Sequence, residues 1–159
     1  METIYEVPVL LRREIEALMV KPFLDAFEKE LGHEKTYEIV EKVIAEIAFE
    51  QGKDYAVVLG GNGIDALMGQ AESWSANDAL DMQMYVENET DCYSPVKRCA
   101  YVDMYERIGM KELGKVLSCL RDEFFYQGFN PEMEMCRSKT LMDGGDCCDF
   151  CFKFPKEQD

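Results

Sequence analysis

Residues 142–154, "MDGGDCCDFCFKF", combine a turn with an alternating strand and indicate how the chain folds. "MDGG" has the Asp and Gly residues of tight hairpin turns, and after it the side chains alternate between two faces. One face would carry Cys148 and the phenylalanines, and the other would carry Cys147, Asp149 and Cys151. Residues 132–141 also alternate, so we predict an antiparallel hairpin with "MDGG" as its turn.

The first half of the chain predicts a helical hairpin. Residues 9–31 carry apolar side chains at the spacing of one helix face, namely Leu11, Ile15, Leu18, Met19, Phe23, Phe27 and Leu31. Pro22 should kink or divide this helix, because its ring blocks the preceding turn. A second apolar stripe spans residues 37–48, with Gly32 and Gly52 as the helix stops. A glycine-containing loop then leads into a shorter third helix.

A second strand hairpin is predicted in the middle of the chain. Residues 79–87 alternate between apolar and polar side chains, as a half-buried strand does, and residues 92–98 would return as their partner. Pro95 restricts that partner to a sheet edge or a bulge, because proline has no N–H to donate. Two helices follow, ended by Gly109 and Gly128.

The predicted order is three helices, two strands, two helices and two strands. Strands that come in hairpins form antiparallel sheets, so we predict an α+β fold with about four strands and helices packed on them. With 159 residues the chain suits one domain. It would comprise a helical N-terminal part at residues 1–75 and an α+β core at residues 76–159.

Charge and cysteine content restrict the partners and the compartment. A net charge of −15 repels nucleic acid and anionic membranes, and no uncharged apolar run is long enough to span a bilayer. The seven cysteines are an odd number, which favours free thiols in a reducing compartment. We therefore expect an acidic, cytoplasmic protein that binds a small molecule; self-association into a homo-oligomer stays open.

The cysteines do not form a metal-binding motif. Apart from the cluster at the last strand, they are scattered singly, and His33 lies far away in sequence. Zinc or iron would need distant cysteines to converge, so we predict no cofactor and no metal ligand. Buried packing is the commoner fate of a single cysteine.

One helix and one strand carry residues that indicate a polar site. Cys119 and Asp122 are three positions apart, and hence on one helix face. Arg137, in a strand that should be half buried, needs an anionic partner. Asp122, Asp149 or a ligand would meet this need.

A stretch from Arg98 to Phe150 matches a known family in order and spacing. It reads "RCAYVDMYERIGMKELGKVLSCLRDEFFYQGFNPEMEMCRSKTLMDGGDCCDF". Its motifs, among them "ELG", "LRD", "GFNP" and "CDF", resemble the core of the L-2-amino-thiazoline-4-carboxylic acid hydrolase family. Members often have histidine at position 147 and arginine at position 151, where this chain has cysteines. The element order is also similar to four-vinyl-reductase-type ligand-binding domains, a likeness of fold only.

The resemblance implies a site and a reaction. In the family reaction, water opens a five-membered ring at the carbon between sulfur and two nitrogens, giving carbamoyl-cysteine. The implied catalytic residues are Cys119, Asp122, Cys148 and Asp149, and the implied substrate contacts are Arg137, Thr140, Tyr105 and Asn130. Arg137 would bind the carboxylate, and an aspartate would transfer protons. The nucleophile is either water or a thiolate, with Cys119 slightly favoured over Cys148 because a carboxylate lies within one helix turn.

Three functions remain open at this point. The first is a hydrolase that opens a small sulfur- and nitrogen-containing heterocycle or cleaves an amide-like bond. The second is a non-catalytic sensor of a small molecule or metal on the same scaffold, which the cysteines at 147 and 151 motivate. The third is a structural partner protein, which would expose a large apolar patch.

Overall fold

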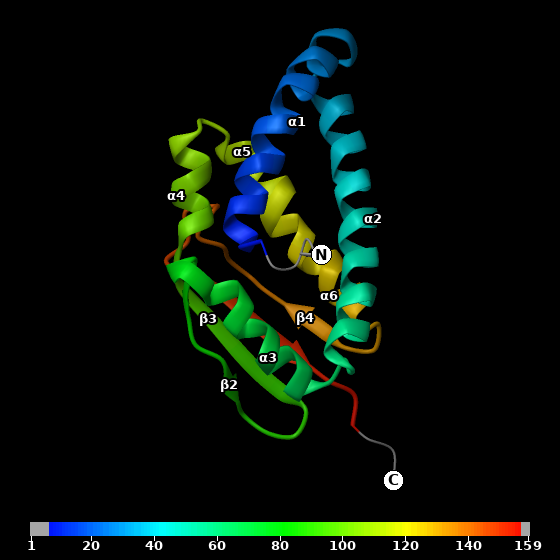
Figure 1. Ribbon diagram of the computed structural model, residues 1–159, viewed down its shortest axis with the longest axis vertical. Coiled ribbons are helices and arrows are strands. Elements are labelled where there is room, and N and C mark those ends of the chain that lie inside the picture. Colours follow the sequence, from blue (N-terminus) through cyan, green and yellow to red (C-terminus); the bar gives the residue numbers. More distant parts are fainter. Residues whose placement is uncertain (1–6, 157–159) are drawn as a thin grey trace.

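The fold consists of an antiparallel five-stranded sheet with helices packed against it (Figure 1). The computed structural model describes residues 7–156, with the backbone alone at residues 70–73. The predicted α+β class is confirmed. The sheet has five strands instead of about four, because residues 79–87 form two short strands and not one.

The two predicted hairpins join into one sheet. The strands are β1 (Leu80–Met82), β2 (Tyr85–Val86), β3 (Asp91–Cys99), β4 (Glu134–Cys136) and β5 (Cys148–Lys153). They lie in the order β1, β3, β5, β4, and β2 also pairs with β3. The central ladder runs from Asp91 opposite Lys153 to Val96 opposite Cys148. One strand from each hairpin therefore forms the middle of the sheet.

The helices form a long hairpin and a shorter group beside the sheet. They are α1 (Val9–Leu31), α2 (His33–Leu59), α3 (Ile64–Ser75), α4 (Ala100–Arg107), α5 (Lys111–Gly114), the π-helix η3 (Lys115–Leu120) and α6 (Arg121–Phe129), with a 3₁₀ turn η2 at Ala76–Asp78. The α1–α2 hairpin is confirmed and extends away from the sheet (Figure 1). α1 runs through Pro22 as one helix and is not divided there. Within the described residues, no helix is both long enough and apolar enough to cross a membrane.

Gly52 lies inside α2, which continues to Leu59 and does not end there, whereas Gly128 is the last residue but one of α6 and the helix ends one residue beyond the predicted stop. A Cβ on Gly52 would stand 2.0 Å from the carbonyl oxygen of Phe125, and a Cβ on Gly128 would stand 1.9 Å from that of Phe49. These distances leave no room for a side chain. The glycines let α2 and α6 approach backbone to backbone, a use of glycine that a helix-stop rule does not recognise.

The strand connections fit the prediction at Pro95 and differ from it at "MDGG". β3 is a central strand and not the edge that Pro95 allowed. The predicted alternative of a bulge fits, because the ladder with β1 shifts register between Asp81 and Met82 and pairing on that side resumes only at Tyr85. Proline is tolerated opposite this interruption. "MDGG" does not form a tight hairpin, because β4 already ends at Cys136 and residues 137–147 make a longer loop.

The apolar face of β5 is directed toward the helices as predicted. Phe152 is 1% exposed and its ring contacts Tyr126 of α6 edge to face at 4.7 Å between centroids. Tyr126, Phe129 and Phe152 belong to one apolar cluster, and Tyr105, Leu113 and Leu117 belong to a second one around α4 and η3. The candidate site lies where α1, α6 and the sheet meet between these clusters.

Candidate active site

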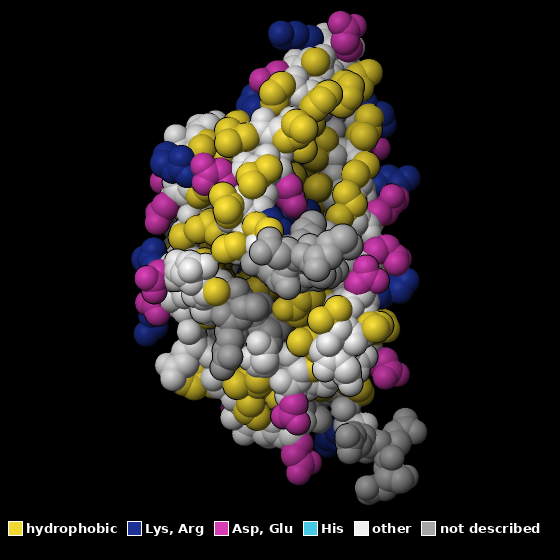
Figure 2. Space-filling view, in the orientation of Figure 1, with side chains coloured by type: hydrophobic (Ala, Val, Ile, Leu, Met, Phe, Trp, Pro, Cys, Tyr) yellow, Lys and Arg dark blue, Asp and Glu magenta, His cyan; other side chains and the backbone are white. Residues whose placement is uncertain are grey.

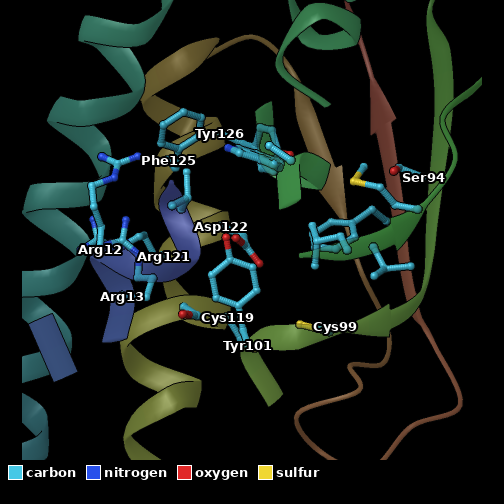
Figure 3. A pocket seen from close by; sticks show the side chains of 18 of the residues that line it. Arg12, Arg13, Ser94, Cys99, Tyr101, Cys119, Arg121, Asp122, Phe125 and Tyr126 are labelled. Atoms are coloured by element: carbon cyan, nitrogen blue, oxygen red, sulfur yellow. The ribbon is translucent and has the colours of Figure 1, made fainter. Parts of the chain in front are cut away.

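A cavity of about 330 Å³ opens between the helices and the sheet (Figure 3). Its walls come from the start of α1, from η3 and α6, and from β1, β3 and β5. The lining includes the polar side chains of Arg12, Arg13, Gln51, Ser94, Ser118, Arg121 and Asp122. Aromatic rings complete it, among them Trp74, Tyr101, Phe125 and Phe150. An apolar cavity of this volume with a few convergent polar groups is typical of a small-molecule site.

Arginines gather at one wall of the cavity. Arg12 and Arg13 come from α1, and Arg121 begins α6 (Figure 3). Arg13 and Arg121 are nearly fully buried and share the carboxylate of Glu16, whose Oε2 lies 3.6 Å from Nη2 of Arg121. Burial and the neighbouring Arg13 lower the pKa of Arg121 to about 10. Two buried guanidinium groups beside one carboxylate make this wall suited to an anion.

Asp122 supplies the acidic group of the cavity. Its Oδ2 accepts a 2.6 Å hydrogen bond from Nη1 of Arg137, and Nη2 of the same guanidinium donates to the carbonyl of Cys119 at 2.9 Å. The guanidinium of Arg137 lies over the ring of Phe150. Burial raises the pKa of Asp122 to about 6, although Arg137 opposes the rise. A third of the Asp122 side chain stays open, and because the residue lines the cavity, this part is available to a ligand.

The thiols of the cavity are protonated at neutral pH. Burial, and then the neighbouring Asp122, hold the pKa of Cys119 far above the usual range of a thiol. Burial also raises the pKa of Cys99 to about 11, even though the backbone N–H groups of Tyr101 and Val102 oppose the rise. Since the thiolate is the nucleophilic form, neither side chain is an activated nucleophile in this state.

A buried hydroxyl of β3 faces the cavity opposite the arginines. Ser94 is 1% exposed, and its Oγ has no hydrogen-bond partner among the described residues. In Figure 3, Ser94 and Cys99 lie on one side of the cavity, the three arginines on the other, and Asp122 with Tyr101 between them. A buried hydroxyl without a partner carries a desolvation cost, which a polar ligand atom or water in the cavity would remove.

Comparison with known protein families agrees with this geometry. A family model described as L-2-amino-thiazoline-4-carboxylic acid hydrolase matches residues 12–152. The chain belongs to this family. The match extends beyond the stretch from Arg98 to Phe150 and includes the arginines of α1. Among curated proteins none matches the chain.

The structure brings some of the residues that the family resemblance implies to one place. Cys119 and Asp122 line the cavity. Arg137 lies behind Asp122 and holds it, as the need of a buried arginine for a carboxylate predicts. The hydroxyl of Tyr105 lies 3.1 Å from Oγ of Ser118, a residue of the π-helix that lines the cavity. Tyr105 therefore contacts a lining residue but does not line the cavity itself. π-helical turns are frequent at functional sites, and this one carries both Ser118 and Cys119.

The other implied residues support loops around the cavity and do not line it. Asp149 accepts hydrogen bonds from the backbone N–H groups of Ser138 and Lys139 and from the Ser138 hydroxyl. Thr140 donates to Asp143, and Asn130 donates to the carbonyl of Asn62. The buried Cys148 sulfur accepts from the N–H of Leu141. Their assignment to catalysis or substrate contact therefore stays a prediction.

Sequence reasoning missed most of the arginine-lined wall. Arg13 shares the buried side of α1 with Ala17 and Leu24. An arginine in line with small and apolar residues at helical spacing was the available signal for a buried guanidinium. Arg121 lies within the motif "LRD" beside Asp122, but the sequence did not separate its role from that of Arg137. Ser94 offered no signal, because only the fold brings β3 to the cavity.

The remaining cysteines lie outside the cavity. Cys136 and Cys151 are paired across β4 and β5, with 2.6 Å between their sulfurs on the face of the sheet away from Phe152. Nowhere in the described part of the chain do three or more His, Cys, Asp and Glu side chains come together as metal ligands would. The prediction that no metal is bound is not tested by this observation.

Proposed function

We propose that this protein is a hydrolase that opens a small, carboxylate-bearing heterocycle of the 2-amino-thiazoline type. The observation that carries the proposal is one cavity in which buried arginines face a carboxyl group whose pKa is about 6. Membership of the family makes such a reaction the expected chemistry.

The charges of the cavity support one orientation of such a substrate. The substrate carboxylate would pair with Arg13 and Arg121, whose planar guanidinium groups suit a bidentate contact. The amidine-like end would then lie toward Asp122, which can accept hydrogen bonds from its nitrogens. The hydroxyl of Ser94 would gain a polar partner at the same time. A ring this small fits a volume of about 330 Å³.

Attack by water suits the charges better than attack by a thiolate. Ionised Asp122 would take a proton from water while the water oxygen bonds to the ring carbon between sulfur and the nitrogens. With the ring nitrogen already protonated in the amidinium form of the substrate, the hydroxyl on this carbon would release its proton to solvent as it becomes a carbonyl and the carbon–sulfur bond breaks. Protonated Asp122 would give its proton to the leaving sulfur. A carboxyl group with a pKa of about 6 is close to matched for both transfers. Cys119 remains protonated next to Asp122 and acts as part of the wall.

The test is turnover of 2-amino-thiazoline-4-carboxylate by the purified chain, followed by the appearance of a free thiol and of carbamoyl-cysteine. We expect ring opening by the wild type and by Cys119→Ala, with no covalent adduct on the protein by mass spectrometry. Loss of turnover in Cys119→Ala, together with an adduct at that residue, would replace water attack by thiol attack.

Calorimetric titration with the same compound separates the hydrolase from the sensor. Binding that depends on Arg121 but is never followed by ring opening would favour the non-catalytic module. If neither binding nor turnover is found, the proposed substrate class is wrong.

A further inference from the structure

The outer side of the α1–α2 hairpin exposes a large apolar surface, here named the outer stripe. It consists of Leu11, Ile15, Leu18, Met19, Phe23, Phe27 and Leu31 on α1 and Ile39, Val43 and Ile47 on α2. Each of these side chains is between 41% and 67% exposed. Figure 2 shows hydrophobic side chains gathered over the two helices on one face of the molecule.

The outer stripe is larger than the apolar patches of typical monomers. A large aromatic side chain buries roughly 150–250 Å². The lower end of this range, taken for the mainly aliphatic residues of the outer stripe at about half exposure, gives on the order of 750 Å². The largest apolar patch of a monomer is roughly 300–600 Å². A stable protein interface buries about 800 Å² on each partner. The exposed apolar area therefore matches one side of a dimer interface.

The spacing of the outer stripe suits a second copy of the same helix. Every fourth residue of α1 contributes to it, in the series Leu11, Ile15, Met19, Phe23, Phe27 and Leu31. Each step of four residues turns about 40° round the helix, so Leu11, Ile15, Met19 and Phe23 stay close enough in direction to form one i±4 ridge. Two ridges of this kind interdigitate when the helices cross at about −50°. A copy related by a twofold axis supplies the identical ridge. We propose that two copies of this chain associate through the outer stripes of their α1–α2 hairpins.

The charges favour this occupant over a lipid surface. The whole chain has a net charge of −15, which opposes binding to the anionic leaflet of a membrane. α1 is nearly balanced, with four Lys or Arg and five Asp or Glu residues, whereas α2 has three Lys and six Asp or Glu residues. A second copy is therefore repelled least along α1. The dimer would also restrain the helix whose other side carries Arg13 into the cavity.

Sedimentation velocity of the full chain over a range of micromolar concentrations tests the proposal. We expect the wild type to sediment as a dimer and the double variant Phe23→Glu/Phe27→Glu to sediment at half that mass. Both phenylalanines are more than half exposed, so the variant should keep its fold, which its circular dichroism would verify. Val86→Glu is the matched control, because Val86 is 51% exposed on β2 and lies outside the outer stripe, and it should remain dimeric.

Three outcomes would overturn the proposal. They are a wild type that is monomeric at every concentration, a folded double variant that remains dimeric, and a Val86→Glu variant that dissociates as readily as the double variant. Flotation of a monomeric wild type with phosphatidylcholine vesicles would assign the outer stripe to a membrane surface instead.

Discussion

The apolar stripe of α1 and the apolar face of β5 are both recognised from periodic apolar residues, but one is largely exposed and the other is covered. Phe150 and Phe152 of β5 lie against α6 and form part of the cavity. Phe23 and Phe27 of α1 are 58% and 51% exposed. The apolar face of β5 lies beside the polar groups of the site, whereas Phe23 and Phe27 are not among the residues that line the cavity.

The difference shows that periodicity identifies a stripe without identifying its partner. α1 has two sides that could meet the core, and the side that does so carries Arg13, Ala17 and Leu24. The small Ala17 allows close packing, and Arg13 reaches Glu16 and the cavity. The more apolar side of α1, which carries the outer stripe, therefore stays exposed and could contact another molecule. Turnover and stability should therefore depend on the residues around the cavity and in the core, and much less on the outer stripe.

The largest expected effect is loss of turnover in Asp122→Asn, because Asp122 lines the same cavity as the apolar face of β5. An amide cannot take the proton of water, so kcat should fall by about 10²- to 10⁴-fold. Asp25→Asn is the control on α1, where Asp25 pairs with Lys21, and its kcat should be unchanged. Steady-state kinetics on the thiazoline carboxylate gives both values. An Asp122→Asn variant within tenfold of the wild type would remove Asp122 from the mechanism.

The next largest effect concerns stability. Phe152→Ala should lower the free energy of unfolding by about 3–5 kcal/mol, because it leaves a cavity in a packed core. Phe27→Ala should change it by no more than about 0.5 kcal/mol in dilute, dissociated protein, since half of its side chain is already in water. Denaturant unfolding measures both, and equal losses would contradict the contrast between the two stripes.

A smaller effect is expected on the pH dependence of the rate. The reaction needs ionised Asp122, so the rate should fall as the pH decreases through about 6. Arg137 lowers the pKa of Asp122, and Arg137→Gln should therefore move this acid limb to higher pH. Lys139→Gln, which removes an exposed pair with Asp146, should leave the limb in place. If the acid side of the pH–rate profile of Arg137→Gln is unchanged or shifts to lower pH, a group other than Asp122 controls it.

The smallest effect distinguishes the two aspartates. Asp149→Ala removes the acceptor of the loop at Ser138 and Lys139 and should lower the free energy of unfolding by about 1–2 kcal/mol. Burial alone would raise the pKa of Asp149, but the hydrogen bonds from Ser138 and Lys139 hold it below its usual range. This stabilisation is therefore fully present at pH values above the pKa of Asp149 in the unfolded state. It is lost as the pH falls through the lower pKa of Asp149 in the folded state.

Two further measurements complete the comparison of the aspartates. Turnover per folded molecule should remain within a fewfold of the wild type in Asp149→Ala. Asp146→Ala, with its 81% exposed side chain, should show little change in either quantity. A large loss of kcat without loss of stability in Asp149→Ala would show that Asp149 is a catalytic residue.

Much of the fold follows from local signals, and less of the site does. Period-two alternation predicted β5 and its faces, and the need of a buried guanidinium for a carboxylate predicted that Arg137 would find an acidic partner. The glycine at 52 misled, because the same residue ends a helix or permits close packing. Arg13, Arg121 and Ser94 come from three distant segments, so no spacing rule could place them together.

By itself the sequence determined the α+β class, the two strand pairings and the long helical hairpin, because these depend on patterns among residues that are near in sequence. It also determined the family, because the family is recognised from the order of its motifs. Only the tertiary structure decided which side of α1 is buried, which aspartate opens into the cavity, and that arginines from α1 and α6 share one wall. The reason is physical: burial, desolvation and ion pairing depend on which surfaces meet in space, and a periodic pattern is compatible with more than one such arrangement.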